Sequence, residues 1–139
     1  DWTQQLGAAC FEALFRLLER QIQAGVPALI VETAFWNELA TARFLDLKAR
    51  YRVEFLQFYC TAKTDILYQR ELDRRASGER HACHTGSTLL TLEEFQTLVE
   101  GPRYARLELD GKLMEMDTND LARVDYMHLM RAAALAVNR

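Results

Sequence analysis

The chain has little proline, no long apolar run and no excess of basic residues. It contains two prolines in 139 residues, and its net charge is −3 at pH 7. We therefore expect no nonspecific binding to nucleic acid or to an anionic membrane surface. No apolar run approaches the ~20 residues that a membrane span needs. Half of the residues are hydrophobic and 27% are charged, which predicts one globular domain over residues 1–139.

Cysteine is also scarce. The three cysteines, Cys10, Cys60 and Cys83, are odd in number and widely spaced, so no disulfide framework is predicted. Cys10 lies on an apolar helix face and Cys60 ends an apolar run, and we expect both to be small buried hydrophobic residues. This usage is typical of a reducing compartment, and the first residues do not resemble a secretory signal. We therefore predict a cytoplasmic protein.

Two motifs that bind metals or phosphates are missing. His81, Cys83 and His84 offer zinc ligands, but they lie too close together and no second cluster accompanies them, so no metal site is predicted. None of the six glycines begins the pattern Gly-x-x-x-x-Gly-Lys-Ser/Thr, and Gly111-Lys112 is followed by leucine. The chain therefore lacks the loop whose backbone N–H groups surround phosphates.

Apolar periodicity predicts the first three elements of the fold. Apolar residues at three- and four-residue spacing predict a helix over residues 3–24, which Gly25 ends. Residues 28–31, Ala-Leu-Ile-Val, form a continuous apolar run, which is typical of a central parallel strand buried on both faces. A second helix is predicted to run to about Arg50, with Asn37 as its N-terminal cap.

The remaining elements follow the same alternation. The pattern predicts a strand, a helix, a short capped helix, a β-hairpin and a last helix. The strand is predicted at residues 53–60, and the helix after it runs from about residue 64 to the break at Ser77-Gly78. The capped helix opens at Thr91 and Glu94. The hairpin pairs 106–109 with 113–116 around Asp110-Gly111, and the last helix begins at Asn119 or Asp120. We see no linker or repeat, so the predicted fold class is a three-layer α/β/α domain with a mostly parallel sheet.

Polar residues follow the apolar runs where strands are predicted to end. In parallel α/β folds, ligands bind beyond the carboxyl ends of the strands. Those ends are Glu32-Thr33, Cys60-Thr61 and Asp117-Thr118. A carboxylate at the end of a buried strand is costly unless it is used or paired, so we favour a functional role for Glu32. For Asp117-Thr118, capping of the last helix is an equal alternative.

Residues 70–84 gather four arginines and two histidines in an otherwise mildly acidic chain. Arginine forks match phosphate oxygens in geometry. Because the segment begins on a helix and breaks at Ser77-Gly78, residues 70–90 are a candidate lid that closes over phosphates. The alternative is surface pairing of Arg70 with Asp73 and of Glu71 with Arg75. Glu71 explains Arg75 sufficiently, which leaves Arg70 and Arg74 as the candidates on the helix.

At this point the residues resemble the P-loop small kinases, and more closely the bacterial kinases grouped with AAA-family ATP-binding proteins. The resemblance covers nearly the whole chain, and its most specific part is Gly78-x-Arg80-His81-x-x-His84. The other segments that carry it are weak alone: residues 28–35, Cys60-Thr-Ala62, Arg70 with Arg74, Glu94-Phe95 and Met116-Asp117-Thr118.

The resemblance implies an ATP-dependent phosphotransferase, which passes the γ-phosphoryl group of Mg-ATP to a small acceptor. It implies a P-loop-kinase-like fold whose first strand and phosphate loop precede residue 1, so the 139 residues alone would be inactive. ATP and Mg²⁺ are the implied cofactors. The implied catalytic residues are Glu32, Arg70, Arg74 and Arg80; the cofactor-binding residues are Arg74, His81, Asp117 and Thr118; the substrate-binding residues are Thr33, Trp36 and Arg43.

Alternatives stay open for two of these residues and for the function of the chain. Arg43 suits a solvated helix face, and Trp36 suits a core position as well as the wall of an acceptor pocket. The chain could also be a non-catalytic nucleotide-binding or interaction domain without a P-loop, or a zeta-toxin-like sugar-nucleotide kinase. The expected partners are a nucleotide and a small-molecule acceptor, without nucleic acid or membrane, and a homodimer is left open.

Overall fold

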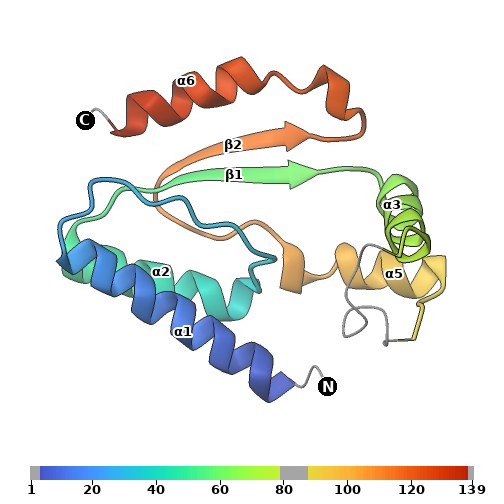
Figure 1. Cartoon of the computed structure of the whole chain (residues 1–139), viewed down its shortest axis with the longest axis horizontal. Helices are drawn as coiled ribbons and strands as arrows, with labels where there is room; N and C mark the ends of the chain where they lie inside the picture. The colour runs from blue at the N-terminus through green and yellow to red at the C-terminus, as the bar shows by residue number, and fades with distance from the viewer. Residues whose placement is uncertain (1–3, 79–87, 138–139) are drawn as a thin grey trace.

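A computed structural model of the chain describes residues 4–78 and 88–137 (Figure 1). The fold is mixed α/β, as the alternating pattern predicted. The helices are α1 (Gln4–Gln23), α2 (Asn37–Tyr51), α3 (Thr64–Ala76), α5 (Leu92–Val99) and α6 (Tyr126–Val137), with short 3-10 turns at Pro102–Tyr104 and Leu121–Arg123. The strands are β1 (Leu56–Thr61) and β2 (Lys112–Asp117). No helix in the described ranges is both long and apolar enough to cross a membrane.

The two strands pair in parallel, from Leu56 opposite Lys112 to Thr61 opposite Asp117. The hairpin predicted around Asp110-Gly111 is wrong, because the second half of that pattern pairs with β1 instead. Lys48 of α2 explains part of this outcome. Its ammonium group donates to the Asp110 carbonyl at 2.6 Å and to the Asp110 carboxylate at 3.0 Å, which ties the turn to α2.

One edge of β1 carries no neighbouring strand among the described residues. The carbonyls of Phe55 and Thr61 accept hydrogen bonds from Lys112 and Thr118 on the β2 side. Backbone groups alternate in direction along a strand, so those of Leu56, Phe58 and Cys60 face the other way. We call these three residues the open edge of β1.

The central strand predicted at residues 28–31 does not form. This segment follows α1 as an extended stretch without strand pairing, and its Ile30 side chain is 98% exposed. The apolar run was recognised correctly, but a strand also needs a partner within hydrogen-bonding distance. Val31 still packs partly against the core, whereas residues 28–30 are exposed.

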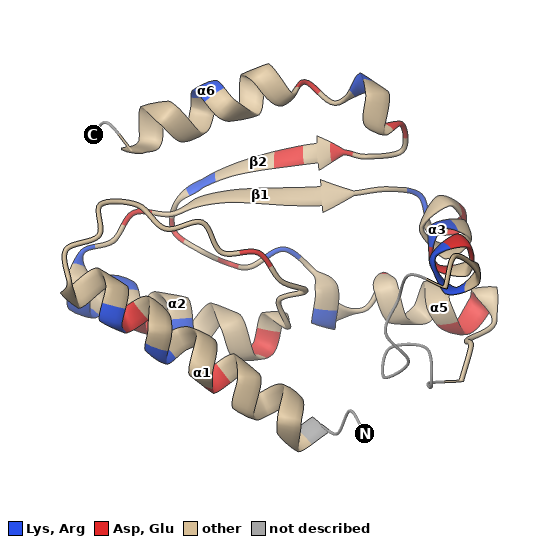
Figure 2. Cartoon of the chain, in the orientation of Figure 1, with Lys and Arg blue, Asp and Glu red and all other residues tan. Residues whose placement is uncertain are grey.

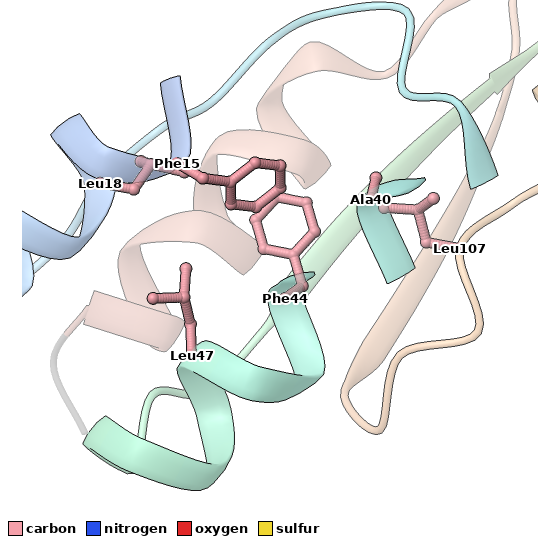
Figure 3. Packing of buried hydrophobic residues seen from close by; sticks show 6 residues of the cluster. All are labelled: Phe15, Leu18, Ala40, Phe44, Leu47 and Leu107. Atoms are coloured by element: carbon pink, nitrogen blue, oxygen red, sulfur yellow. The ribbon is translucent and has the colours of Figure 1, made fainter. Parts of the chain in front are cut away.

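The hydrophobic core lies between α1, α2 and the segment that leads into β2. Figure 3 shows its buried members, which are Phe15, Leu18, Ala40, Phe44, Leu47 and Leu107. Phe44 contacts three other rings edge-on: Phe15 at 4.9 Å, Phe35 at 5.3 Å and Phe55 at 5.6 Å between centroids. These ring contacts join both helices to the residues that precede β1.

Three smaller predictions also need correction. Asn37 is the first residue of α2 and not its cap; the N-cap position is Trp36, which makes no side-chain capping bond, and the Asn37 amide donates to the carbonyls of Ala105 and Arg106. The last helix begins at Tyr126 rather than near residue 120. Cys10 and Cys60 are exposed rather than buried. The capping box at the start of α5 is confirmed, with both of its reciprocal hydrogen bonds present.

Candidate functional site

The carboxyl ends of β1 and β2 meet, as expected for parallel neighbours. The backbone N–H of Thr118 donates to the Thr61 carbonyl at 2.7 Å, and the Thr118 hydroxyl donates to the same oxygen at 2.9 Å. The Thr61 hydroxyl donates to the Met116 carbonyl at 3.3 Å. These bonds hold the two strand ends together and fix the position of the residues that follow β2.

A turn then crosses from β2 to the start of α3. The Asp117 carboxylate accepts the backbone N–H of Asn119 at 2.8 Å, which is the local bond of an Asx turn. The side-chain oxygen of Asn119 accepts the backbone N–H of Lys63 at 2.8 Å. Asp117 therefore shapes the turn 117–119, and Asn119 attaches that turn to the N-terminus of α3.

Arg70 reaches the same turn from the second turn of α3. Its Nη2 donates to the carbonyl of Thr118 at 2.6 Å and to that of Asn119 at 3.3 Å. The structure thus brings together Arg70, Asp117 and Thr118, which were predicted to share a site. The guanidinium is half-buried and engaged with carbonyl oxygens, so in this conformation it holds the turn in place.

The rest of the arginine cluster on α3 centres on Glu71. Arg75 Nε lies 2.9 Å from Glu71 Oε1, which confirms the structural explanation for Arg75, and Arg74 Nη2 lies 3.6 Å from Glu71 Oε2. The alternative pairing of Arg70 with Asp73 does not form, because Asp73 accepts from the amide of Gln69 at 2.8 Å. Arg74 is more than half exposed and is the arginine of this helix that is freest to turn toward a ligand.

Glu32 lies near the end of β1. Although Cys60 is exposed by surface area, partial desolvation of its thiol raises the pKa, and the negative charge of Glu32 raises that pKa further, since a nearby carboxylate disfavours a thiolate. The end of the segment 28–32 is therefore close to the carboxyl end of β1, although no strand pairing joins them. Thr33 follows directly, and its carbonyl accepts the backbone N–H of Phe35 at 2.9 Å.

Two predicted substrate residues make structural contacts instead of facing this edge. The Trp36 indole stacks on Phe11 at 6.3 Å between centroids, and the Arg103 guanidinium lies 4.5 Å from the Trp36 ring centre. Arg43 points to α1, where it pairs with Glu12 at 2.9 Å. This pairing agrees with the structural explanation for Arg43, and its role in substrate binding stays a prediction.

Two other predicted residues, Arg80 and His81, lie outside the described residues, together with the rest of residues 79–87 of the candidate lid. Within the described ranges, no group of three or more His, Cys, Asp or Glu side chains could hold a metal ion. The sequence prediction missed the two residues that join the turn to α3, Asn119 and Lys63. Asn119 stands directly after Asp117-Thr118 and could have been included on that ground, whereas only the backbone of Lys63 takes part.

Comparison with known proteins reveals a shared fold. The chain is similar to the crystal structure of a "putative kinase" from Chloroflexus aurantiacus, with a TM-score of 0.78 and 23% sequence identity. The match covers 99% of this chain and 72% of the other. No protein-family model matches the chain, and no curated protein matches it. At this identity the likeness shows a common α/β fold.

Proposed function

We propose that the chain belongs to an ATP-dependent phosphotransferase, which transfers the γ-phosphoryl group of Mg-ATP to a small acceptor. The observation that carries the proposal is the set of polar residues at the carboxyl ends of the strands. The fold that positions them is shared with a protein described as a kinase. Glu32, Asp117 and Arg70 come from distant parts of the sequence and converge at this edge, where parallel α/β folds bind their ligands.

ATP and Mg²⁺ fit these residues only in part. Mg²⁺ is commonly held by one or two carboxylates together with phosphate oxygens and water, and Glu32 and Asp117 could serve as such carboxylates. Arg74 could pair with a phosphate if its weak contact with Glu71 opened. The 139 residues, however, do not contain the pattern Gly-x-x-x-x-Gly-Lys-Ser/Thr, whose backbone N–H groups surround the phosphates in a P-loop. We therefore propose that a further polypeptide segment supplies the glycine-rich loop.

The sheet offers a place for the strand that would carry that loop. The apolar run 28–31 lies near the open edge of β1 at its carboxyl end, since the charge of Glu32 influences Cys60. Among the described residues, no backbone hydrogen bond joins the run to β1. Figure 2 shows that both segments are free of charge apart from Glu32. A parallel strand inserted between them would pair with Leu56, Phe58 and Cys60 and would bury Ile30.

The proposed roles follow from these positions. Glu32 would accept the proton of the acceptor hydroxyl or order a water of Mg²⁺. Arg74, with Arg80 and His81 of the candidate lid, would neutralise charge on the transferred phosphoryl group. Arg70 would position the turn 117–119 beside the nucleotide. Thr33 would border the acceptor.

The test uses the complete reading frame that contains these 139 residues. We expect Mg-ATP to raise its melting temperature by several degrees, because a ligand at a hundredfold its Kd stabilises the native state by about 2.7 kcal/mol. We expect Arg74→Ala to reduce ADP release with a panel of acceptors by at least about tenfold, with little loss of stability. Arg16→Ala is the matched control, since Arg16 is an exposed helical arginine paired with Glu12.

Two results would contradict the proposal. A flat melting curve up to millimolar Mg-ATP would remove nucleotide binding. A full reading frame without the pattern Gly-x-x-x-x-Gly-Lys-Ser/Thr would remove the phosphate loop. Nucleotide binding without ADP release for any acceptor would instead favour the non-catalytic alternative.

A further inference from the structure

A second region of the molecule offers a pocket that the proposed phosphotransfer does not use. It is shallow and largely open to solvent, has a volume of about 510 Å³, and lies between α5, the turn after α5 and the first turn of α2. Small-molecule sites commonly measure about 300–1,000 Å³ and combine an apolar lining with a few polar groups. Leu90, Leu98 and Pro102 supply apolar surface here, and Glu38, Thr97 and Arg103 supply polar groups.

Arg103 is the cation at this pocket, and an aromatic stack holds it. Its guanidinium lies 4.5 Å from the ring centre of Trp36, whose other neighbour is Phe11 at 6.3 Å. A stacked guanidinium is oriented in advance and keeps its N–H groups available at the rim of its plane. Among residues 4–78 and 88–137, no residue accepts a hydrogen bond from the Arg103 side chain, and none forms an ion pair with it.

The walls of the pocket are fixed by contacts that do not involve a ligand. The Asn37 amide donates to the carbonyls of Ala105 and Arg106, which joins the start of α2 to the segment after Arg103. Gly101 approaches the end of α5 so closely that a Cβ atom would lie 3.0 Å from the Thr97 carbonyl oxygen. The pocket therefore depends on a close backbone approach that only glycine accommodates without a shift.

The two carboxylates of the pocket differ in their engagement. Glu94 is occupied by the capping box, where it accepts from the backbone N–H and the hydroxyl of Thr91 at 2.8 and 3.0 Å. These bonds lower the pKa of Glu94. Glu38 has no such partner within the described part of the chain. The pocket thus presents one available cation, Arg103, and one available anion, Glu38, beside an apolar wall.

We propose that this pocket binds a small organic anion, in which a carboxylate or phosphate ester is attached to an apolar body. The anionic group would pair with the stacked Arg103, and the apolar body would lie against Leu90 and Leu98. Glu38 would disfavour a ligand with anionic groups at both ends. This binding requires neither ATP nor a glycine-rich loop, so it can fail while the phosphotransferase proposal holds, and the reverse is also true.

Tryptophan fluorescence tests the proposal on the 139-residue chain. Trp2→Phe leaves Trp36 as the reporter, because the sequence has two tryptophans. The probes are phenyl phosphate, benzoate, terephthalate and uncharged benzyl alcohol. We expect saturable changes with phenyl phosphate or benzoate, and the stronger of the two identifies the anionic group. Terephthalate should bind more weakly than benzoate, and Glu38→Gln should reduce that difference.

Variants of Arg103 decide whether the cation is responsible. Arg103→Ala should weaken binding of the anion by at least about tenfold, because a charge-assisted hydrogen bond is lost. Arg103→Lys should weaken it several-fold, since lysine keeps the charge but loses the fork. Arg106→Ala is the matched control and should leave binding unchanged. Leu98→Asp should also weaken binding, and circular dichroism with thermal melting shows whether each variant folds.

Any of three results would overturn the proposal. The first is the absence of a saturable response to both anions up to tens of millimolar. The second is benzyl alcohol binding as tightly as the anions, which would show an apolar pocket without anion recognition. The third is an equal loss in folded Arg103→Ala and Arg106→Ala, which would show a general effect of positive charge.

Discussion

The two sides of the segment that leads from α1 to α2 differ in how their apolar residues are covered. On the helix side, Phe15, Phe44 and Leu47 are buried in one cluster. On the strand side, Ile30 is 98% exposed, and Phe58 on β1 is 39% exposed. Both sides have the composition of a protein interior. An apolar sequence pattern therefore indicates which residues are suited to burial, but a residue is buried only where another element packs against it.

The last helix belongs to the uncovered side. Figure 1 places α6 across the sheet from α1 and α2. Its apolar side chains are largely exposed, including Met127 at 58%, Met130 at 64% and Leu135 at 66%. A third layer is thus in position, but its apolar face lacks the contacts that the first layer has. A further strand with its following helix would supply apolar surface on this side.

The largest expected effect comes from breaking the covered side. Phe44→Ala should lower the free energy of unfolding by about 3–5 kcal/mol, as is typical of a buried phenylalanine. Ile30→Ala is the matched control and should change it by no more than about 0.5 kcal/mol, because its side chain is exposed. Urea denaturation measures both. Equal losses in the two variants would remove the contrast between the two sides.

A smaller loss is expected where the sheet meets the covered side. A Cβ atom on Gly111 would lie 2.6 Å from the carbonyl oxygen of Phe55, and that oxygen accepts the backbone N–H of Lys112. Gly111→Ala should therefore cost about 1–3 kcal/mol through displaced backbone. Thermal melting with a neutral result would show that the entry to β2 adjusts more easily than its packing indicates.

Hydrogen exchange can resolve the contrast within a single strand. The amides of Gln57, Tyr59 and Thr61 face β2 and should exchange slowly, whereas those of Leu56, Phe58 and Cys60 should exchange near the rate of exposed amides. In the complete reading frame, the second set should become protected. Uniform protection of all six amides in the 139-residue chain would show that the open edge is already covered.

The smallest effect concerns the charge beside the open edge. Because Glu32 raises the pKa of the Cys60 thiol, Glu32→Gln should lower that pKa and increase the rate of alkylation at a given alkaline pH. The raised pKa also means that the folded state favours the protonated thiol over the thiolate. The free energy of unfolding therefore falls as the pH rises through the titration of Cys60. Mass spectrometry of the Cys60 peptide follows the rate, with Cys10 as the internal control.

Much of the fold was predictable from the sequence where the interactions are local. The capping box at Thr91 and Glu94, the span of α2 and the pairing of Glu71 with Arg75 all depend on residues a few positions apart. The failures depend on distant partners. Residues 28–31 lack a neighbouring strand, and residues 113–116 found theirs in β1, more than fifty positions earlier.

The candidate site was predictable in the same uneven way. The rule that ligands gather at the carboxyl ends of parallel strands led to Asp117-Thr118 and Glu32. It could not show that the guanidinium of Arg70 would rest on two carbonyl groups, because that contact spans nearly fifty residues and carries no local pattern. Arg103 was missed for the same reason, since its stacking partner Trp36 lies far away in the sequence.

The bonds from Arg70 to the carbonyls of Thr118 and Asn119 also have a mechanical meaning. Together with the bond from Lys63 to Asn119, they fasten α3 to the turn after β2 at two points about two helical turns apart. A rotation of α3 must either break these bonds or carry the turn with it. The helix and the turn would then move as one rigid unit, and a displacement at the C-terminal end of α3 would shift the residues that follow β2.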